Sequence, residues 1–387
     1  MKNTTAIKLV KELIQIESTD PGTYEEEIFT FIKQWLSALP DIRLDEDEVL
    51  PGRKNLMATL PGDDASLPAL IFICHMDTVV VGDGWHLPPF EAIEKEGRIY
   101  GRGACDMKSG LACCMTAFDY AVHQCCQNGR KPKRSLKLIC TVDEEDFMRG
   151  AEQCIKSGWV HENDWILDAE PTNKQIQVAH KGRTWFEIEV KGHTAHASTP
   201  WKGADAIAAM AEIIRDIRIQ IQNTPVHHDL GKSTVTFGQI FGGYRPYVVP
   251  DSCKVWIDMR LVPPTNTKKA EAIVTSAIEN ARKTIPGIHG SYTITGNRPY
   301  IEKDDHSPLL SALKTACTKS VKTEPVISCF PGYTDTAVIS GILNNYNCMS
   351  YGPGNLECAH QPDEWVAVED IVRCRDVYFE LIENTLF

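Results

Sequence analysis

The feature that most constrains the fold is an uninterrupted apolar run that ends in a histidine. Residues 69–74 read Ala-Leu-Ile-Phe-Ile-Cys, and His75 and Asp77 follow. Such a run predicts a strand buried on both faces, as in a parallel sheet. Ligands of open α/β sheets bind outside the carboxyl ends of the strands, so we expect His75 at a binding crevice. Asp77 is close enough to hydrogen-bond the ring of His75 and fix its tautomer.

The same arrangement recurs at two further strands. Residues 135–142 form an apolar stretch that ends in the acidic run 143–146, and residues 165–167 lead into Asp168 and Glu170. Strands that alternate with helical patterns predict a mostly parallel sheet. One acidic turn alone would be read as a solvated surface feature. Three strands with such endings instead predict a cluster of ligating side chains.

The strand pattern changes near residue 177. From there to about residue 297 apolar and polar side chains alternate, as in residues 252–260, which predicts a sheet covered on one face. Helical patterns at residues 204–222 and 267–284 would cover that face.

The predicted fold class is therefore α/β with an inserted α+β domain. A length of 387 residues is enough for two cores. The main domain would hold a mostly parallel central sheet flanked by helices. The predicted ranges are 1–177 and 298–387 for the main domain, and 178–297 for the insertion.

Composition excludes several classes of partner. The formal net charge of −12 argues against nucleic acid and anionic membranes. No apolar run approaches the roughly 20 residues that cross a bilayer, and the first residues lack the pattern of a signal peptide. We therefore expect a cytoplasmic protein with no membrane partner.

The fourteen cysteines favour free thiols. They include no Cys-x-x-Cys pair, and many lie in apolar stretches, where cysteine behaves as a small hydrophobe. A redox or thiol-metal protein is an alternative, but it lacks this motif.

The candidate ligands suit a pair of metal ions. Two histidines with three carboxylates fit two Zn²⁺, or Co²⁺ or Mn²⁺, with one carboxylate bridging. A further carboxylate must stay off the metals to accept a proton, and adjacent glutamates provide that division of roles. The candidates are His75, Asp106, Glu144, Glu145, Asp168 or Glu170, and His360.

The chain resembles a known family over essentially its whole length. The family is that of the two-domain zinc amidohydrolases, which includes acetylornithine deacetylase, succinyl-diaminopimelate desuccinylase, aminoacylase and carboxypeptidase G. The motifs that carry the resemblance are His75-Met76-Asp77, Gly101-Arg102-Gly103 with Asp106-Met107-Lys108, Asp143-Glu144-Glu145, Glu170-Pro171-Thr172, Gly192-His193-Thr194-Ala195-His196, Gly242-Gly243, Asp258-Met259-Arg260, Thr334-Asp335 and Gly352-Pro353-Gly354 with His360.

The resemblance implies a role for each residue of the metal site. His75 and Glu170 would bind one zinc, and Asp106 would bridge to the second, with a cis peptide between Asp106 and Met107. Glu145 and His360 would bind the second zinc. Glu144 would be the general base, and Asp77 would orient His75.

The resemblance also implies substrate contacts. His196 of the inserted domain would stabilise the oxyanion in the partner subunit of a homodimer, which forms through that domain. Arg260 would meet the substrate carboxylate, unless it is a cross-strand surface charge. Thr334 belongs to the expected substrate loops. These loops depart from the family pattern, with Tyr247 near the position of a usual asparagine and Tyr333 in place of a glycine.

The expected function is hydrolysis of an amide bond beside a free carboxylate. We expect an N-acyl amino acid as substrate, as for the deacetylase and desuccinylase. A di- or tripeptidase or carboxypeptidase is the alternative within the family. A metal-free binding protein on the same fold would have lost a ligand, and none is lost.

Overall fold

The computed structural model describes residues 2–387, with side chains from residue 6 onward. The chain divides into two compact units, which comprise residues 1–178, 302–330 and 334–387, and residues 179–301 and 331–333. The second unit extends past the expected boundary at residue 297. The backbones of His180 and Ile301 exchange two hydrogen bonds, of 3.0 and 2.9 Å, and these keep residues 298–301 with the inserted unit.

The sheet of the first unit has the order β15-β10-β16-β9-β4-β8-β3-β2. Strands β16, β9, β4 and β8 are parallel to one another, whereas β3, β2 and β10 pair antiparallel at the borders. This parallel centre confirms the predicted fold class. The strands are β2 (Arg43–Leu50), β3 (Arg53–Leu60), β4 (Leu70–His75), β8 (Leu136–Thr141), β9 (Trp165–Asp168), β10 (Ile176–His180), β15 (Ile327–Phe330) and β16 (Cys348–Ser350).

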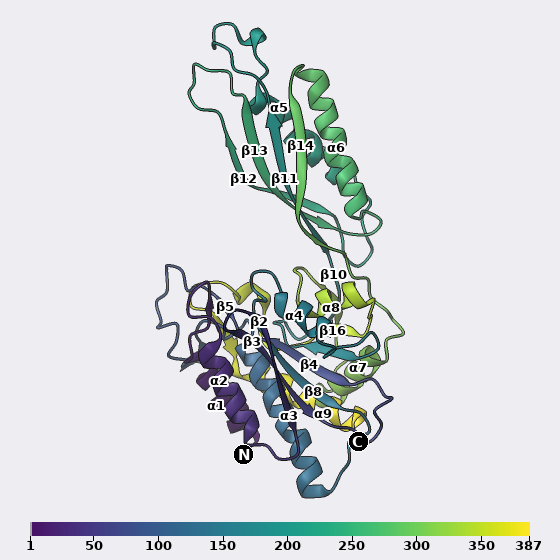
Figure 1. The fold of residues 1–387 in the computed structure, drawn as a ribbon. Coiled ribbons are helices and arrows are strands. Elements are labelled where there is room, and N and C mark those ends of the chain that lie inside the picture. Colours follow the sequence, from purple (N-terminus) through teal and green to yellow (C-terminus); the bar gives the residue numbers. More distant parts are fainter. Residues whose placement is uncertain (1) are drawn as a thin grey trace. The chain divides into compact units, whose positions relative to one another are not determined.

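Helices cover both faces of this sheet (Figure 1). Leu70, Phe72 and Cys74 of β4 belong to one core cluster with residues of α1, α3, α7 and α9. Helices α4 and α8 contact β3, β4 and β9 and pack on each other. The continuous burial of β4 follows from this double cover. The helices are α1 (Lys2–Ile14), α2 (Glu26–Ser37), α3 (Lys108–Asn128), α4 (Arg149–Lys156), α7 (Pro308–Val321), α8 (Asp335–Leu343) and α9 (Val368–Thr385).

The second unit is a four-stranded antiparallel sheet of order β12-β13-β11-β14 with two helices (Figure 1). Burial alternates strictly along β13, and the buried residues pack with α5 and α6, as predicted for a sheet covered on one face. The elements are β11 (Gly182–Lys191), η1 (Pro200–Lys202), α5 (Ala206–Gln222), β12 (Thr234–Gly242), β13 (Ser252–Leu261), α6 (Thr267–Thr284) and β14 (His289–Arg298).

Short strands and a short helix support the loops of the first unit. They are β1 (Thr19–Asp20), which pairs with β5 (Thr78–Val79), the sheet of β6 (Ile93–Lys95), β7 (Arg98–Tyr100) and β17 (Trp365–Ala367), and η2 (Leu356–Cys358). Within residues 2–387, every helix is too short or too polar to cross a membrane.

Candidate metal centre

The parallel centre of the sheet brings three strand ends together. His75 is the last residue of β4, which lies between β8 and β9. Glu144 and Glu145 follow β8, and Glu170 follows β9. Because the three strands are parallel, their carboxyl ends lie at one edge of the sheet, where ligands of α/β folds bind.

Two loops complete the cluster. Asp106 lies just before α3, and its peptide bond to Met107 is cis, as the resemblance implied. His360 follows η2 and adopts a φ of +61°. Asp106 is buried, whereas the side chain of His360 is 48% exposed. The exposed histidine therefore marks the side from which solvent reaches the cluster.

Asp106 lies between the two histidines. Its Oδ1 is 3.2 Å from His75 Nε2, and its Oδ2 is 3.4 Å from His360 Nε2. Glu145 Oε2 is 3.0 Å from His360 Nε2. Glu170 Oε1 and Glu144 Oε2 are 3.6 and 4.0 Å from His75 Nε2.

The spacing of these atoms suits metal ions. His75, Asp106 and Glu145 form one group, and His75, Glu144 and Glu170 form another. Within each group the potential ligand atoms all lie within 4.8 Å of one another. Imidazole nitrogens and carboxylate oxygens are the ligand set that zinc and similar divalent ions accept, so these residues fit such ions.

The pKa shifts of the residues in the cluster also favour a bound cation. Burial, with neighbouring carboxylates, raises the pKa of Glu144 and Glu170 well above the usual value. Hydrogen bonds with Asp106 and Glu145 raise the pKa of His360 to about 10. Burial opposes protonation of His75, yet the hydrogen bond with Asp106 raises its pKa well above normal. Buried carboxylates crowded in this way are stabilised by positive charge, which a divalent cation supplies.

Asp77 hydrogen-bonds the ring of His75 through its backbone oxygen. His75 Nδ1 lies 2.9 Å from the backbone oxygen of Asp77, and 3.8 Å from its carboxylate. The carboxylate instead accepts a hydrogen bond of 3.0 Å from the backbone N–H of Glu145. Asp77 therefore fixes the ring of His75 through its main chain. Its side chain supports residues 143–146, the glutamate turn that follows β8.

Asp168 and Thr334 face inward. Asp168 accepts a 2.6 Å hydrogen bond from the hydroxyl of Thr336, and burial raises its pKa to about 6. It belongs to neither ligand group, which favours Glu170 as the ligand. Thr334 is 1% exposed, with its hydroxyl 2.8 Å from that of Thr336, so its predicted substrate contact stays a prediction.

The predicted substrate residues of the second unit lie on its strands and loops. His196 is exposed, with Nδ1 2.8 Å from the hydroxyl of Ser198. Tyr247 is 60% exposed, and its backbone oxygen accepts from the residue after His196. Arg260 on β13 pairs with Asp258 of the same strand through two hydrogen bonds of 2.9 and 3.1 Å. That pairing is compatible with the surface-charge alternative for Arg260.

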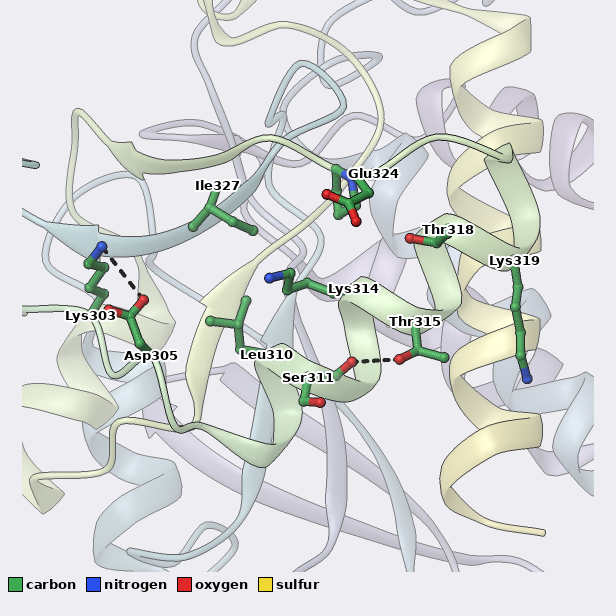
Figure 2. Close-up of a pocket in the computed structure, with 11 residues that line it drawn as sticks. Lys303, Asp305, Leu310, Ser311, Lys314, Thr315, Thr318, Lys319, Glu324 and Ile327 are labelled. Atoms are coloured by element: carbon green, nitrogen blue, oxygen red, sulfur yellow. Dashed lines mark hydrogen bonds and ion pairs between the residues drawn. The ribbon is translucent and has the colours of Figure 1, made fainter.

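A hollow of about 710 Å³ in the first unit does not contain the cluster. It lies against α7 and β15, and Figure 2 shows Lys303 and Asp305, 3.6 Å apart, at one side of it. Charged and hydroxyl side chains line it, and none of the predicted site residues is among them.

Two arginines near the cluster, the partly buried Arg53 and the buried Arg102, have no role in the sequence-based predictions. Arg53 on β3 pairs with Asp20 at 2.6 Å and with Glu25, and lies 3.7 Å from Asp143 of the glutamate turn. Arg102 pairs with Glu364 at 2.6 Å. The available signal was Arg102 inside the Gly101-Arg102-Gly103 motif, but its partner Glu364 is distant in the sequence.

Comparison with known proteins identifies the family. Residues 71–384 match the sequence model of peptidase family M20/M25/M40. A probable succinyl-diaminopimelate desuccinylase of Staphylococcus aureus is 26% identical, over 97% of this chain and 96% of its own. An acetylornithine deacetylase of Proteus mirabilis is 28% identical, over 99% of this chain and 97% of its own.

Solved structures share the fold. Aminopeptidase PepT of Bacillus cereus superposes with a TM-score of 0.79 at 21% identity, covering 99% of this chain and 98% of that one. A dinuclear metal-binding M20 peptidase of Bacillus subtilis gives 0.71 at 17% identity, covering 100% and 98%. Because the family match spans most of the sequence, this chain is a metallohydrolase of peptidase family M20/M25/M40.

Proposed function

We propose that this metallohydrolase removes the acyl group from an N-acyl amino acid by hydrolysing the amide bond. The observation that carries the proposal is the convergence of two histidines and four carboxylates at one sheet edge. The proposal of a deacylase is further supported by the relatives named desuccinylase and deacetylase, because both align with nearly the whole chain.

Five residues would hold two Zn²⁺ ions, with Co²⁺ or Mn²⁺ as alternatives. His75 and Glu170 would hold one ion, Glu145 and His360 the other, and Asp106 would contribute to both. When bound, the ions would supply Lewis acidity, which polarises the scissile carbonyl and makes a water molecule more acidic.

Glu144 performs the proton transfers. It is 7% exposed and belongs to one ligand group, but it lies farther from His75 Nε2 than Asp106 or Glu170 does, so in this proposal it stays off the metals. Its carboxylate takes the proton of the attacking water and returns it to the leaving amine, first as general base and then as general acid. The metal-free binding protein has no support, because no ligand is missing. All fourteen cysteines are unpaired by disulfides and lie outside the ligand groups of the described residues, which argues against a thiol-metal centre.

The inserted unit supplies the remaining contacts in this proposal. His196 stabilises the oxyanion in the partner subunit, and Arg260 and Tyr247 bind the substrate. A homodimer is supported by the edge strand β12, where Ile240 and Phe241 are 53% and 59% exposed. Apolar side chains on an open sheet edge favour association with another chain.

Amine release from a substrate panel tests the function. The zinc-loaded protein should release amine from N-acetyl or N-succinyl amino acids, and Glu144→Gln should abolish release. Asp146→Asn is the matched control, because Asp146 lies in the same turn but is 53% exposed, and it should retain activity. Release from dipeptides alone would establish the peptidase alternative, and no release from any class by zinc-loaded protein would overturn the proposal.

Subunit exchange tests the role of His196 across a dimer. His196→Ala and Glu144→Ala proteins, each inactive, should regain activity when mixed dimers form. Mixed dimers that stay inactive would contradict action across the interface.

A further inference from the structure

An ion pair between Arg102 and Glu364 is buried against the loop that precedes α3. Arg102 Nη1 donates to Glu364 Oε2 over 2.6 Å, and the two side chains are 2% and 0% exposed. Burying two charges is unfavourable unless further hydrogen bonds satisfy both partners. Here the donors of those hydrogen bonds include backbone N–H groups of the candidate metal centre.

Glu364 accepts hydrogen bonds from the loop that carries Asp106. Its Oε1 accepts from the backbone N–H of Cys105 at 2.7 Å and of Asp106 at 3.0 Å. Its own backbone oxygen accepts from the N–H of Gly101 at 2.9 Å. Because Arg102 holds the other carboxylate oxygen, the main chain of Asp106 is anchored to one fixed acceptor.

Arg102 ties a third segment to the same pair. Its Nη2 donates to the backbone oxygens of Val80 and Val81 at 3.2 and 3.1 Å. Its guanidinium lies 5.2 Å from the ring centre of Trp85. These residues follow β5 and therefore come shortly after His75. The ion pair thus joins three segments, which follow β5, precede α3 and precede β17.

We propose that Glu364 is a positioning residue for the metal centre. It holds the backbone of Asp106 and the segment of His360 in fixed positions relative to each other. Glu364 comes four residues after His360. His360 Nε2 and Asp106 Oδ2 are 3.4 Å apart, so a small shift of either loop would separate two donor atoms. The inference rests on the proposed function only in taking Asp106 and His360 as metal ligands.

Zinc affinity of the metal-free protein tests this role. Glu364→Gln keeps the size of the side chain and removes the charge that Arg102 pairs with. Groups that orient metal ligands change metal affinity by about 10–100-fold when replaced, and we expect a loss of that size in competition with a chromophoric chelator. Glu369→Gln is the matched control, because Glu369 is 73% exposed and pairs with Lys174, and it should bind zinc as the wild type does.

A second readout separates positioning from general damage. The near-UV circular dichroism of metal-free Glu364→Gln should match the wild type, and raising free zinc by the same factor should restore activity with KM unchanged. Should the glutamine variant not fold, Glu364→Asp keeps a charge for Arg102 but draws the carboxylate back from the amide of Asp106, and it should show the same loss.

Wild-type zinc affinity in a folded Glu364 variant would overturn the inference. A wild-type protein that binds zinc but hydrolyses no substrate would instead overturn the proposed function. In that case the affinity comparison would still decide the role of Glu364, so the two failures are distinguishable.

Discussion

Replacing Arg53 by methionine would remove the positive charge at the centre of a buried acidic group. Arg53 is 10% exposed and donates to Asp20 at 2.6 Å and to Glu25 through Nε at 2.8 Å. Glu25 is 1% exposed, and the side chain of Asp143, 3.7 Å from Arg53, is fully buried. Asp143 keeps its hydrogen bond of 2.7 Å from Arg149 in the variant, whereas Glu25 loses the guanidinium.

The expected loss of unfolding free energy is about 3–5 kcal/mol, the cost of removing one partner of a buried ion pair. The matched control is Arg43→Met on β2, whose side chain is 67% exposed and pairs with Asp45. An exposed pair contributes about 0–1 kcal/mol, so this variant should unfold nearly as the wild type does.

The pH dependence gives a second test. Burial already raises the pKa of Glu25, while its hydrogen bond with Arg53 lowers it. Without Arg53 the folded pKa rises further. A carboxylate whose folded pKa is raised loses stability as pH climbs from its unfolded pKa to its folded one. The penalty of Arg53→Met should therefore be smaller at pH 5 than at pH 7.5.

Urea unfolding of metal-free protein at both pH values measures these quantities without a contribution from bound ions. A penalty below 1 kcal/mol, or one equal at both pH values, would refute the argument that Arg53 compensates buried carboxylates.

Three further predictions concern other parts of the chain. Burial lowers the pKa of His180 to about 4, so its protonation favours the unfolded state below about pH 6.5; this residue should contribute about 2 kcal/mol less to stability at pH 5 than at pH 7, and His180→Gln should change the difference in unfolding free energy between the two pH values by about that amount in urea unfolding. Phe241→Asp should convert the proposed dimer to monomer in light scattering, whereas Val326→Asp, at a residue of the first unit that is 60% exposed, should not. His360→Ala should bind less zinc than Glu144→Gln in elemental analysis, because Glu144 is proposed to stay off the metals.

The strands and the cluster were predictable because both depend on local pattern. The run before His75 predicted a doubly covered strand, and β4 is buried throughout. The alternation at residues 252–260 predicted the covered face of β13.

What failed depended on tertiary contacts. Thr23 and Glu26 have the spacing of a capping box, but Glu25 occupies the cap position and its carboxylate accepts a hydrogen bond from Arg53. Arg102 and Glu364 are 262 residues apart, so no local pattern could pair them.

Metal content measured by elemental analysis tests the central claim most directly. The account predicts about two zinc ions per wild-type chain, and fewer in a folded His75→Ala variant, because His75 belongs to both ligand groups. A wild-type protein without metal, and without activity after addition of Zn²⁺ or Co²⁺, would contradict the proposed metal centre and leave the fold alone established.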